Sequence, residues 1–380
     1  MKDRIWLSSP HLSGNELKFV ERAFHSNWVT SIGENIDEFE HKIQNFLGNS
    51  IEVCALNSAT SCIHLALKML GVSQNDEVLT STLSFVASAN PILYCNAKPV
   101  FIGSEPETWN MCPKALRKAI ENRISKGIIP KAIIVVHLYG MPAKMDELME
   151  VANEYNIPVI EDAAEALGSA FKNQPCGTFG HFGILSFNGN KIITTSGGGA
   201  LICHSRNDKD KAIFLSTQAR DQAPHYQHSQ IGYNYRMSNI VAGVGCAQIE
   251  VLNERIEARR KMHDFYLTVF KDIAGVKIFK EPSLDYFSNH WLSVIIIDEN
   301  ITNKTREHLR LAFLENNIES RPVWKPMHLQ PLFLASLYFG DDTSENLFEN
   351  GLCLPSGSNL TDEDRIRIEN VIRRVFLSRS

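Results

Sequence analysis

Short apolar runs alternate with helical patterns along the first half of the chain, and this alternation restricts the fold most strongly. Six runs are expected to be strands: Ile51–Leu56, Glu77–Ser81, Lys98–Ile102, Ala132–Val136, Pro158–Glu161 and Phe182–Phe187. The helices expected between them are Cys62–Leu70, Phe85–Tyr94, Pro113–Arg123 and Met145–Glu154. Because most of the runs are almost continuously apolar, they predict an α/β fold with a mainly parallel sheet that helices cover on both faces.

The 380 residues suffice for two domains. Helical spacing covers Gly14–Phe24, with Leu17, Val20 and Phe24 as its apolar positions, and a second amphipathic helix runs from about Ile36 to Leu47. We expect residues 1–240 to form a large domain that holds the ligand. Residues 241–380 are expected to form a linking helix and a small C-terminal α/β domain.

The second half of the chain carries the patterns expected of that smaller domain. A charge-rich helical pattern runs from Asn239 to about Phe270. Beyond it, Trp291–Ile297 and Ile318–Val323 are typical of strands, and Lys304–Asn316 is typical of a helix.

Composition narrows the class of partner. Lys and Arg number 38 against 43 Asp and Glu, which gives a net charge of −5 and no basic excess for nucleic acid. The apolar runs are too short to span a bilayer, and the N-terminus lacks a signal core. The eight cysteines are scattered without a C-x-x-C pair. We expect a cytoplasmic protein without a nucleic-acid, membrane or metal partner.

Polar residues follow several expected strands, at the sheet edge where ligands bind in such folds. Ser58-Ala59-Thr60 opens a helix, so its N–H and hydroxyl groups could hold a phosphate. A plain helix cap by Ser58 or Thr60 is the alternative. The topology brings Phe85, His137, Asp162 and the loop with Lys191 to this same edge.

Lys191 lies in the stretch S-F-N-G-N-K-I-I-T-T-S-G-G-G, residues 186–199. Its amine can condense with a carbonyl, and enzymes that use pyridoxal phosphate (PLP) need one such lysine. Asp162 could pair with a protonated pyridine nitrogen, and Phe85 could stack on a planar ring. Each residue alone also fits a solvated lysine, a helix cap or a core aromatic. Their combination favours a cofactor site.

Three segments, E-D-A-A-E-A-L-G, the Lys191 stretch and G-Y-N-Y-R-M-S-N, resemble the DegT/StrS-type sugar aminotransferases. These are PLP enzymes of fold type I, the aspartate aminotransferase fold, that act on nucleotide-linked keto sugars. The resemblance runs from Ser8 to Gly357. S-S-P-H-L-S-G-N-E, A-R-D-Q-A-P-H-Y-Q-H and E-S-R-P-V-W-K-P-M-H-L-Q-P resemble a subgroup, the UDP-4-amino-sugar transaminases of the bacillosamine pathway.

The resemblance implies a set of cofactor-binding residues: Ser58, Ala59, Phe85, Asp162, Glu165, Ser186, Lys191 and Asn234. In this set Lys191 is the catalytic residue, which binds the cofactor and moves the proton to and from the sugar carbon. Glu165 stands beside the phenolic oxygen of the cofactor, where many members have Gln. Asn234 matches an asparagine that reaches the phosphate of the partner subunit, which implies a homodimer with shared active sites. Glu165 is one departure from the family pattern, and T-T-S-G-G-G-A in place of the usual T-T-G-E-G-G-M is another. The lysine itself argues against the dehydratase branch, where histidine replaces it.

The residues that the resemblance places near the substrate are Arg321 and Trp324, and we add Ser9, His11, Trp28 and His137. An arginine fork suits a diphosphate. The implied reaction transfers an amino group from L-glutamate to C4 of a UDP-linked 4-keto-6-deoxy-N-acetylhexosamine. The alternatives are another keto-sugar substrate, 3-keto or dTDP-linked, and a PLP-binding regulator without turnover. Such a regulator usually carries a DNA-binding or basic segment, and none is evident in this sequence. A cofactor-free relative is disfavoured by the intact Lys191, Asp162 and Ser58.

Overall fold

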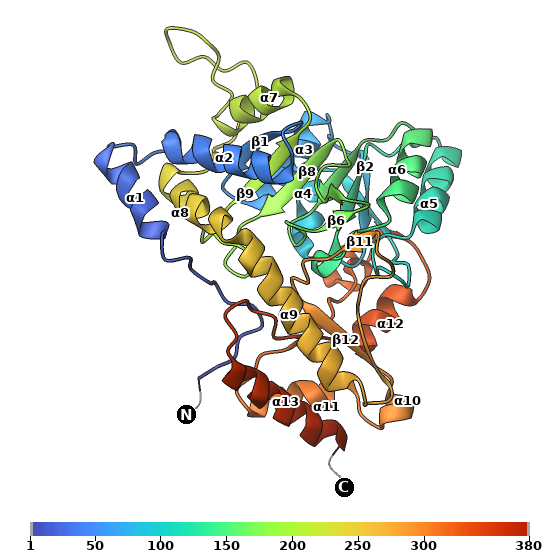
Figure 1. Cartoon of the computed structure of the whole chain (residues 1–380). Coiled ribbons are helices and arrows are strands. Elements are labelled where there is room, and N and C mark those ends of the chain that lie inside the picture. The colour runs from blue at the N-terminus through green and yellow to red at the C-terminus, as the bar shows by residue number, and fades with distance from the viewer. Residues whose placement is uncertain (1–2, 378–380) are drawn as a thin grey trace.

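The computed structural model describes residues 3–377 and contains a large and a small sheet, with a short ribbon beside them (Figure 1). The large sheet has eight strands in the order β1-β9-β8-β5-β4-β2-β3-β14. Their bounds are Glu52–Leu56 (β1), Gly199–Cys203 (β9), Phe182–Ser186 (β8), Val159–Asp162 (β5), Ala132–Val136 (β4), Glu77–Ser81 (β2), Lys98–Ile102 (β3) and Leu337–Phe339 (β14).

Parallel pairing joins β8, β5, β4, β2, β3 and β14, whereas β9 runs antiparallel to both of its neighbours, β1 and β8. The mainly parallel sheet is therefore confirmed. The predicted bounds of β2, β3 and β4 agree with the structure. Nearly every residue of these three strands is buried, so their apolar runs end where the strands end.

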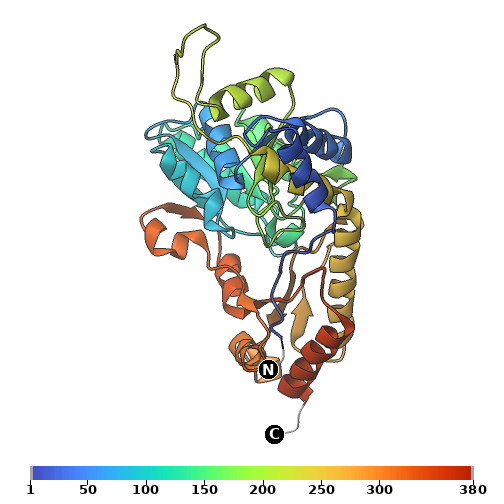
Figure 2. The ribbon, with the colours of Figure 1, turned by 90° about the vertical axis from the view of Figure 1, so that its left-hand side faces the viewer.

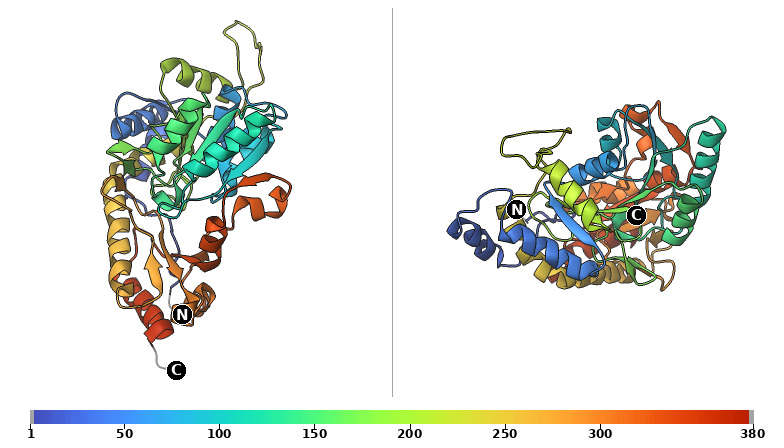
Figure 3. Two further views of the ribbon diagram at one scale, coloured as in Figure 1. Left: turned by 90° about the vertical axis from the view of Figure 1, so that its right-hand side faces the viewer. Right: turned by 90° about the horizontal axis from the view of Figure 1, so that it is seen from above.

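Helices pack on both faces of the large sheet (Figure 3). They are α2 (Glu34–Leu47), α3 (Ala59–Met69), α4 (Asn90–Tyr94), α5 (Pro113–Ser125), α6 (Met145–Glu154), α7 (Arg206–Ser216) and α8 (Asn239–Glu250). Helix α1 (Glu16–His25) packs on α8 and not on the sheet. Alternate residues of β1 serve the two faces: Val53 packs in a cluster with Phe39 of α2, and Cys54 packs in another with Ile63 of α3.

The small domain has an antiparallel sheet in the order β10-β12-β15-β13. Its strands are Val276–Ile278 (β10), Ser293–Ile297 (β12), Gly351–Leu354 (β15) and Arg321–Pro322 (β13). Its helices are α9 (Leu252–Phe270), α10 (Glu299–Thr302), α11 (Arg306–Glu315), α12 (Thr343–Asn350) and α13 (Asp362–Leu377). The ribbon comprises β11 (Tyr286–Phe287), β6 (Ala170–Phe171) and β7 (Gln174–Pro175).

The N-terminal segment ties the two domains together. Ile5 pairs with Ile318 of the small domain, and the chain then ascends toward α1 (Figure 2). Helix α9 spans the same distance in the opposite direction, from the large domain to the small one (Figure 1). No helix within residues 3–377 combines the length and apolar character that a bilayer crossing requires.

The face of α1 that packs on the protein differs from the prediction. Leu17 and Phe24 are 72% and 60% exposed, whereas Phe19 and Ala23 are buried. Helix α1 packs against α8, and the buried face, Glu16, Phe19 and Ala23, is shifted by one residue from the predicted one. The exposed apolar residues of α1, Leu17 and Phe24, therefore make little contact within this chain.

Three other elements depart from the sequence-based prediction. The predicted helix Asn239–Phe270 is two helices, because Val251 leaves the helical conformation between α8 and α9. The predicted helix Phe85–Tyr94 is a 3-10 turn, Val86–Ser88, followed by the short α4. Strand β14 comes from the C-terminal part of the chain but pairs with β3, so residues 241–380 do not all belong to the small domain.

Candidate active site

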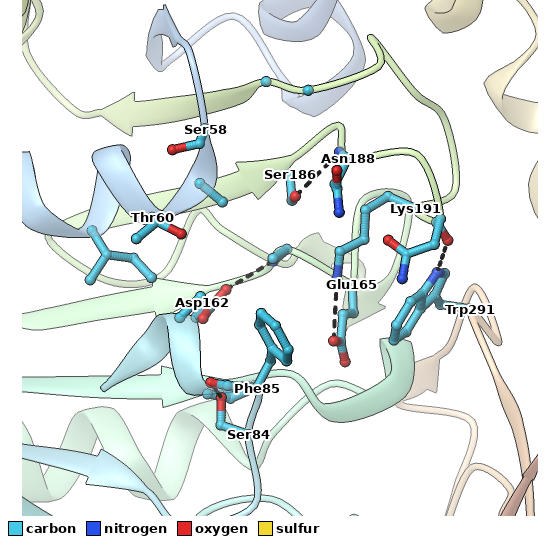
Figure 4. Close-up of a pocket in the computed structure, with 18 of the residues that line it drawn as sticks. Ser58, Thr60, Ser84, Phe85, Asp162, Glu165, Ser186, Asn188, Lys191 and Trp291 are labelled. Atoms are coloured by element: carbon cyan, nitrogen blue, oxygen red, sulfur yellow. Dashed lines mark hydrogen bonds and ion pairs between the residues drawn. The ribbon is translucent and has the colours of Figure 1, made fainter. Parts of the chain in front are cut away.

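A cavity of about 320 Å³ opens at the carboxyl ends of the strands of the large sheet (Figure 4). It collects residues that follow β1, β2, β5 and β8 in the sequence, together with two tryptophans from the C-terminal part of the chain. Of the residues predicted for the site, those that line it are Ser58, Ala59, Phe85, Asp162, Glu165, Ser186, Lys191 and Trp324. The sheet edge expected from the strand pattern is thus the edge that carries the cavity.

The start of α3 forms one wall. Ser58 caps the helix, since its Oγ accepts a hydrogen bond from Ser61 N at 3.0 Å. Gly199 passes so close that a Cβ there would lie 2.5 Å from Ala59 N. The glycine run thus lets the backbone approach the helix start, where exposed N–H groups attract an anion. The structure thus shows the cap by Ser58, and this cap leaves the phosphate site at the same helix start as a prediction.

Asp162 ends β5 and is 6% exposed. Its carboxylate accepts hydrogen bonds from Ser88 Oγ at 2.5 Å and from Ala164 N at 3.2 Å. Among the residues that the structure describes, no cationic side chain lies within ion-pair distance of it. A buried carboxylate with neutral donors only is suited to a cationic ligand in the cavity.

Lys191 and Glu165 face each other across the cavity floor (Figure 4). Lys191 Nζ lies 3.3 Å from Glu165 Oε1 and 4.2 Å from the centre of the Trp291 ring. The other carboxylate oxygen of Glu165 accepts a hydrogen bond from Tyr139 N at 2.8 Å. Burial raises the pKa of Glu165 to about 7, although the adjacent lysine opposes this rise.

Aromatic side chains line the open side of the cavity. Phe85 is 57% exposed, and its ring centre lies 6.0 Å from that of Trp324. Trp324 N donates a hydrogen bond to the Tyr139 hydroxyl at 3.0 Å, which fixes the backbone there. An adjoining hollow shares both rings and adds Arg321, Ser8 and other residues. Arg321 pairs with Glu319 at 2.8 Å.

The predicted contact of His137 with substrate or cofactor is wrong. Its ring is fully buried, where one nitrogen lies 2.9 Å from Glu161 Oε2 and the other accepts from Ala143 N at 3.0 Å. Glu161 also accepts N–H bonds from Gly177 and Gly180 at 2.8 and 2.6 Å. His137 therefore belongs to a buried network behind the sheet edge.

Four other predicted residues line neither the cavity nor the adjoining hollow. Ser9 bonds to Asn359 and His11 to Ser358, each through its side chain, and Ser8 rather than Ser9 borders the adjoining hollow. Trp28 is 53% exposed in the loop after α1. Asn234 is exposed, and its carbonyl accepts a hydrogen bond at 3.3 Å from Asn57, which does line the cavity.

Sequence reasoning missed Trp291, Ser88 and Asn190. Trp291 lies 100 residues after Lys191, at the start of a predicted strand. Its apolar side chain was therefore attributed to that strand and not to a site. Ser88 lay inside a predicted helix. Asn190 comes directly before Lys191, and this position in the sequence could have marked it as a residue of the site.

Comparisons with known proteins find relatives that match nearly the whole chain. The sequence model of the DegT/DnrJ/EryC1/StrS aminotransferase family matches residues 10–375. Bacillus subtilis EpsN, named as a pyridoxal phosphate-dependent aminotransferase, is 48% identical over 99% of this chain and 97% of its own. GDP-perosamine synthase of Escherichia coli O157:H7 is 37% identical, covering 97% of each chain. The UDP-4-amino-4,6-dideoxy-N-acetyl-beta-L-altrosamine transaminase of Campylobacter jejuni is 29% identical over 95% of this chain and 94% of its own.

Solved structures of similar fold include two of interest here. A DegT/DnrJ/EryC1/StrS aminotransferase from Brucella abortus superposes with a TM-score of 0.88 at 27% identity, covering 96% of each chain. The Streptococcus pneumoniae protein Spr1654, named as a sugar aminotransferase and solved in PLP and PMP forms, has a TM-score of 0.88 at 24% identity over 98% of each chain.

Proposed function

We propose a specific reaction for this chain, which belongs to the DegT/DnrJ/EryC1/StrS aminotransferase family and is a PLP-dependent sugar aminotransferase. The proposed reaction moves an amino group from L-glutamate to C4 of a UDP-linked 4-keto-6-deoxy-N-acetylhexosamine. The observation that carries the amine chemistry is the buried pairing of Lys191 with Glu165 in a cavity that also contains Asp162.

Two independent features of the cavity support binding of the cofactor. Asp162 is a buried carboxylate that lacks a cation among the described residues, as expected of the partner of a protonated pyridine nitrogen. Ser58 and Ala59 offer the helix start, and Ser186 a hydroxyl, for the phosphate. PLP, when bound, supplies an aldehyde that carries the amino group and a ring that withdraws electrons.

The protein's own residues then have separate tasks. Lys191 Nζ releases and takes up the proton that moves to and from the reacting carbon. Glu165 holds the amine from one side at 3.3 Å. Phe85 lines the open side of the cavity, where its ring is placed to stack on the cofactor. The hollow with Arg321 and Trp324 has a volume of about 550 Å³, which is large enough for the nucleotide part of a sugar substrate.

The UDP-linked substrate is supported by the subgroup motifs and by the Campylobacter jejuni relative, whose name specifies a UDP-4-amino sugar. The test is to incubate the PLP-loaded enzyme and L-glutamate with 4-keto-6-deoxy sugars linked to UDP, GDP or dTDP. The expected result is a UDP-linked 4-amino product identified by mass spectrometry and NMR. Amination of only the GDP-linked or only the dTDP-linked sugar would contradict the assignment.

A GDP-linked 4-keto sugar is a second candidate. It is favoured by the 37% identity to a GDP-perosamine synthase, which exceeds the 29% to the UDP-sugar transaminase. The same panel separates the two, because the ratio of kcat/KM for the two nucleotides reports the difference in transition-state binding.

We also propose that two copies of the chain form a homodimer with shared active sites. Large apolar side chains are exposed around α1 and on the segment after α7: Leu17, Phe24, Trp28, Val29, Ile32, Tyr226 and Ile231. Such exposure is typical of an interface. Asn234 is exposed beside Asn57 and is free to reach a second copy.

Mixed dimers test the shared site. A chain with Lys191→Ala and a chain with Asn234→Ala should each be inactive alone. If Asn234 serves the partner's site, co-expression restores one intact site in half of the dimers, or about a quarter of wild-type activity. Activity no higher than that of either variant alone, in confirmed mixed dimers, would contradict the shared site. Native mass spectrometry of differently tagged chains gives the proportion of mixed dimers.

Glu165 should make the stability of the cofactor-free protein depend on pH. Its pKa is about 7 in the folded state, against an ordinary value of 4.5. Between pH 4.5 and pH 7 the folded protein therefore binds more protons at this group than the unfolded protein does. Stability contributed by this group is therefore lost as pH rises from 5 to 7. Glu165→Gln should remove on the order of 2 kcal/mol of that loss. Urea unfolding of both proteins at pH 5 and 7.5 measures the difference, and equal pH dependence would refute the shifted pKa.

We place the reaction in the cytoplasm. All eight cysteines are free thiols in the structure, and seven of them are buried. Reduced, buried cysteines are typical of that compartment.

A further inference from the structure

Trp291 lies directly against the amine on which the chemistry depends. We propose that Trp291 is a positioning residue whose indole face holds the Lys191 ammonium group whenever that amine is not joined to the cofactor. The inference rests on the proposed role of Lys191. It adds that the free amine lies against the Trp291 ring between the two half-reactions.

The contact has the geometry of a cation–π interaction. Lys191 Nζ lies 4.2 Å from the centre of the Trp291 ring, and Figure 4 shows the ring beside the lysine side chain. Trp291 is 3% exposed, and the side chain of Lys191 is 11% exposed. Attraction between a cation and an indole face is strongest where water is excluded.

The indole ring is fixed relative to the lysine by its own hydrogen bond. Trp291 Nε1 donates to the carbonyl of Asn190, the residue just before Lys191, at 2.7 Å. The ring and the lysine backbone are therefore tied together although they come from different domains. Ser8 Oγ donates to the same carbonyl at 2.6 Å.

The backbone of Trp291 is fixed as firmly as its ring. Its N–H donates to Asn289 Oδ1 at 2.8 Å, and its carbonyl accepts from Arg259 at 2.6 Å. Arg259 is 1% exposed, lacks a carboxylate partner among residues 3–377, and also donates to the Lys191 carbonyl at 3.4 Å. These bonds, with a further one from Arg259 to Ser8 Oγ at 2.9 Å, join the backbone of Trp291 to that of Lys191 through one buried guanidinium group.

The same loop also positions the group on the other side of the amine. Asn289 Nδ2 donates to the backbone carbonyl of Glu165 at 2.8 Å. The charged groups around the Lys191 amine are thus the Glu165 carboxylate, Asp162 in the cavity wall and Arg259 behind the backbone. Trp291 supplies the uncharged side of this enclosure, so that Glu165 is the one carboxylate within ion-pair distance of the amine among the described residues.

The test is the protonation of Lys191 in the enzyme loaded with pyridoxamine phosphate, where the amine is free. Brief pulses of an amine-acylating reagent at a series of pH values label neutral lysine, and peptide mass spectrometry quantifies Lys191. Trp291→Leu should lower the midpoint of labelling by about one pH unit, because the ring no longer stabilises the charged form. Trp291→Phe should lower it by less.

Trp324→Phe is the matched control, since Trp324 lines the same cavity but its ring centre lies 6.4 Å from that of Trp291. It should leave the Lys191 midpoint unchanged. A Trp291→Leu midpoint equal to that of the wild type would overturn the proposal, even if the variant melts at a lower temperature. If the leucine variant does not fold, an unchanged midpoint in Trp291→Phe decides against it.

The proposed function is tested separately in the same experiment. Bound PLP should protect Lys191 of the wild type from labelling, whereas exposed Lys172 should react equally with and without PLP. Loss of that protection would contradict the role of Lys191 itself. Protection with an unchanged midpoint would reject only the role of Trp291.

Discussion

Replacing Lys191 by arginine is expected to lower turnover by about 10⁴-fold, the upper range for loss of a proton-transfer group. Arginine retains a positive charge near Glu165 and Trp291, but its guanidinium cannot be deprotonated and is a poor nucleophile toward an aldehyde. The variant should still bind PLP, without a covalent link, and should lose it on dialysis. Single-turnover rates with L-glutamate measure the loss.

Lys172→Arg is the matched control for this substitution. Lys172 is 52% exposed and pairs with Asp146 on the surface, so its replacement should leave turnover and the visible spectrum as in the wild type. A Lys191→Arg enzyme that retains a tenth of wild-type turnover would show that another group moves the proton.

Replacing Asp162 by asparagine is the second large effect. The amide keeps the size of the side chain but cannot stabilise a positive charge on the pyridine nitrogen, so the ring withdraws electrons less effectively. We expect kcat for the glutamate half-reaction to fall by about 10²- to 10³-fold, as on removal of other preorganised electrostatic partners. Stopped-flow absorbance measures the rate.

Ser88→Ala is a milder change at the same site, to be compared with Asp162→Asn. It removes the 2.5 Å hydrogen bond to Asp162 while leaving the carboxylate charged. The loss should therefore be smaller, about tenfold or less. An Asp162→Asn enzyme as fast as the wild type would mean that the carboxylate serves another purpose in the cavity.

The sheet was predictable because its central strands are buried on both faces. Burial on both faces requires apolar residues along the whole strand, and this requirement produces the continuous apolar runs seen in the sequence. Strand β9 was not predicted, since it begins inside the glycine run that we assigned to ligand approach. Strand β14 has three residues, and its pairing with β3 spans more than 230 positions of the chain. Elements that exist only through such long-range pairing leave little local signal.

The cavity was predictable to the extent that its residues follow strands in order. Ser58, Asp162 and Lys191 meet because parallel strands bring their carboxyl ends to one edge. His137 follows β4 in the same way, but its ring turns into the network of Glu161, a partner that spacing alone could not reveal. Trp291 belongs to the small domain. The spacing of apolar residues within each domain does not predict how the two domains pack together, so the place of Trp291 in the cavity could not be predicted.

The visible spectrum of the PLP-loaded enzyme tests the central claim most directly. Added L-glutamate should abolish the absorbance band of the lysine-bound cofactor, and a UDP-linked 4-keto-6-deoxy-N-acetylhexosamine should then restore it, because the first substrate leaves its amino group on the cofactor and the second removes it. A band that disappears and returns in that order is the predicted result. The absence of any band after addition of PLP would contradict the account, because Lys191 would then not bind the cofactor.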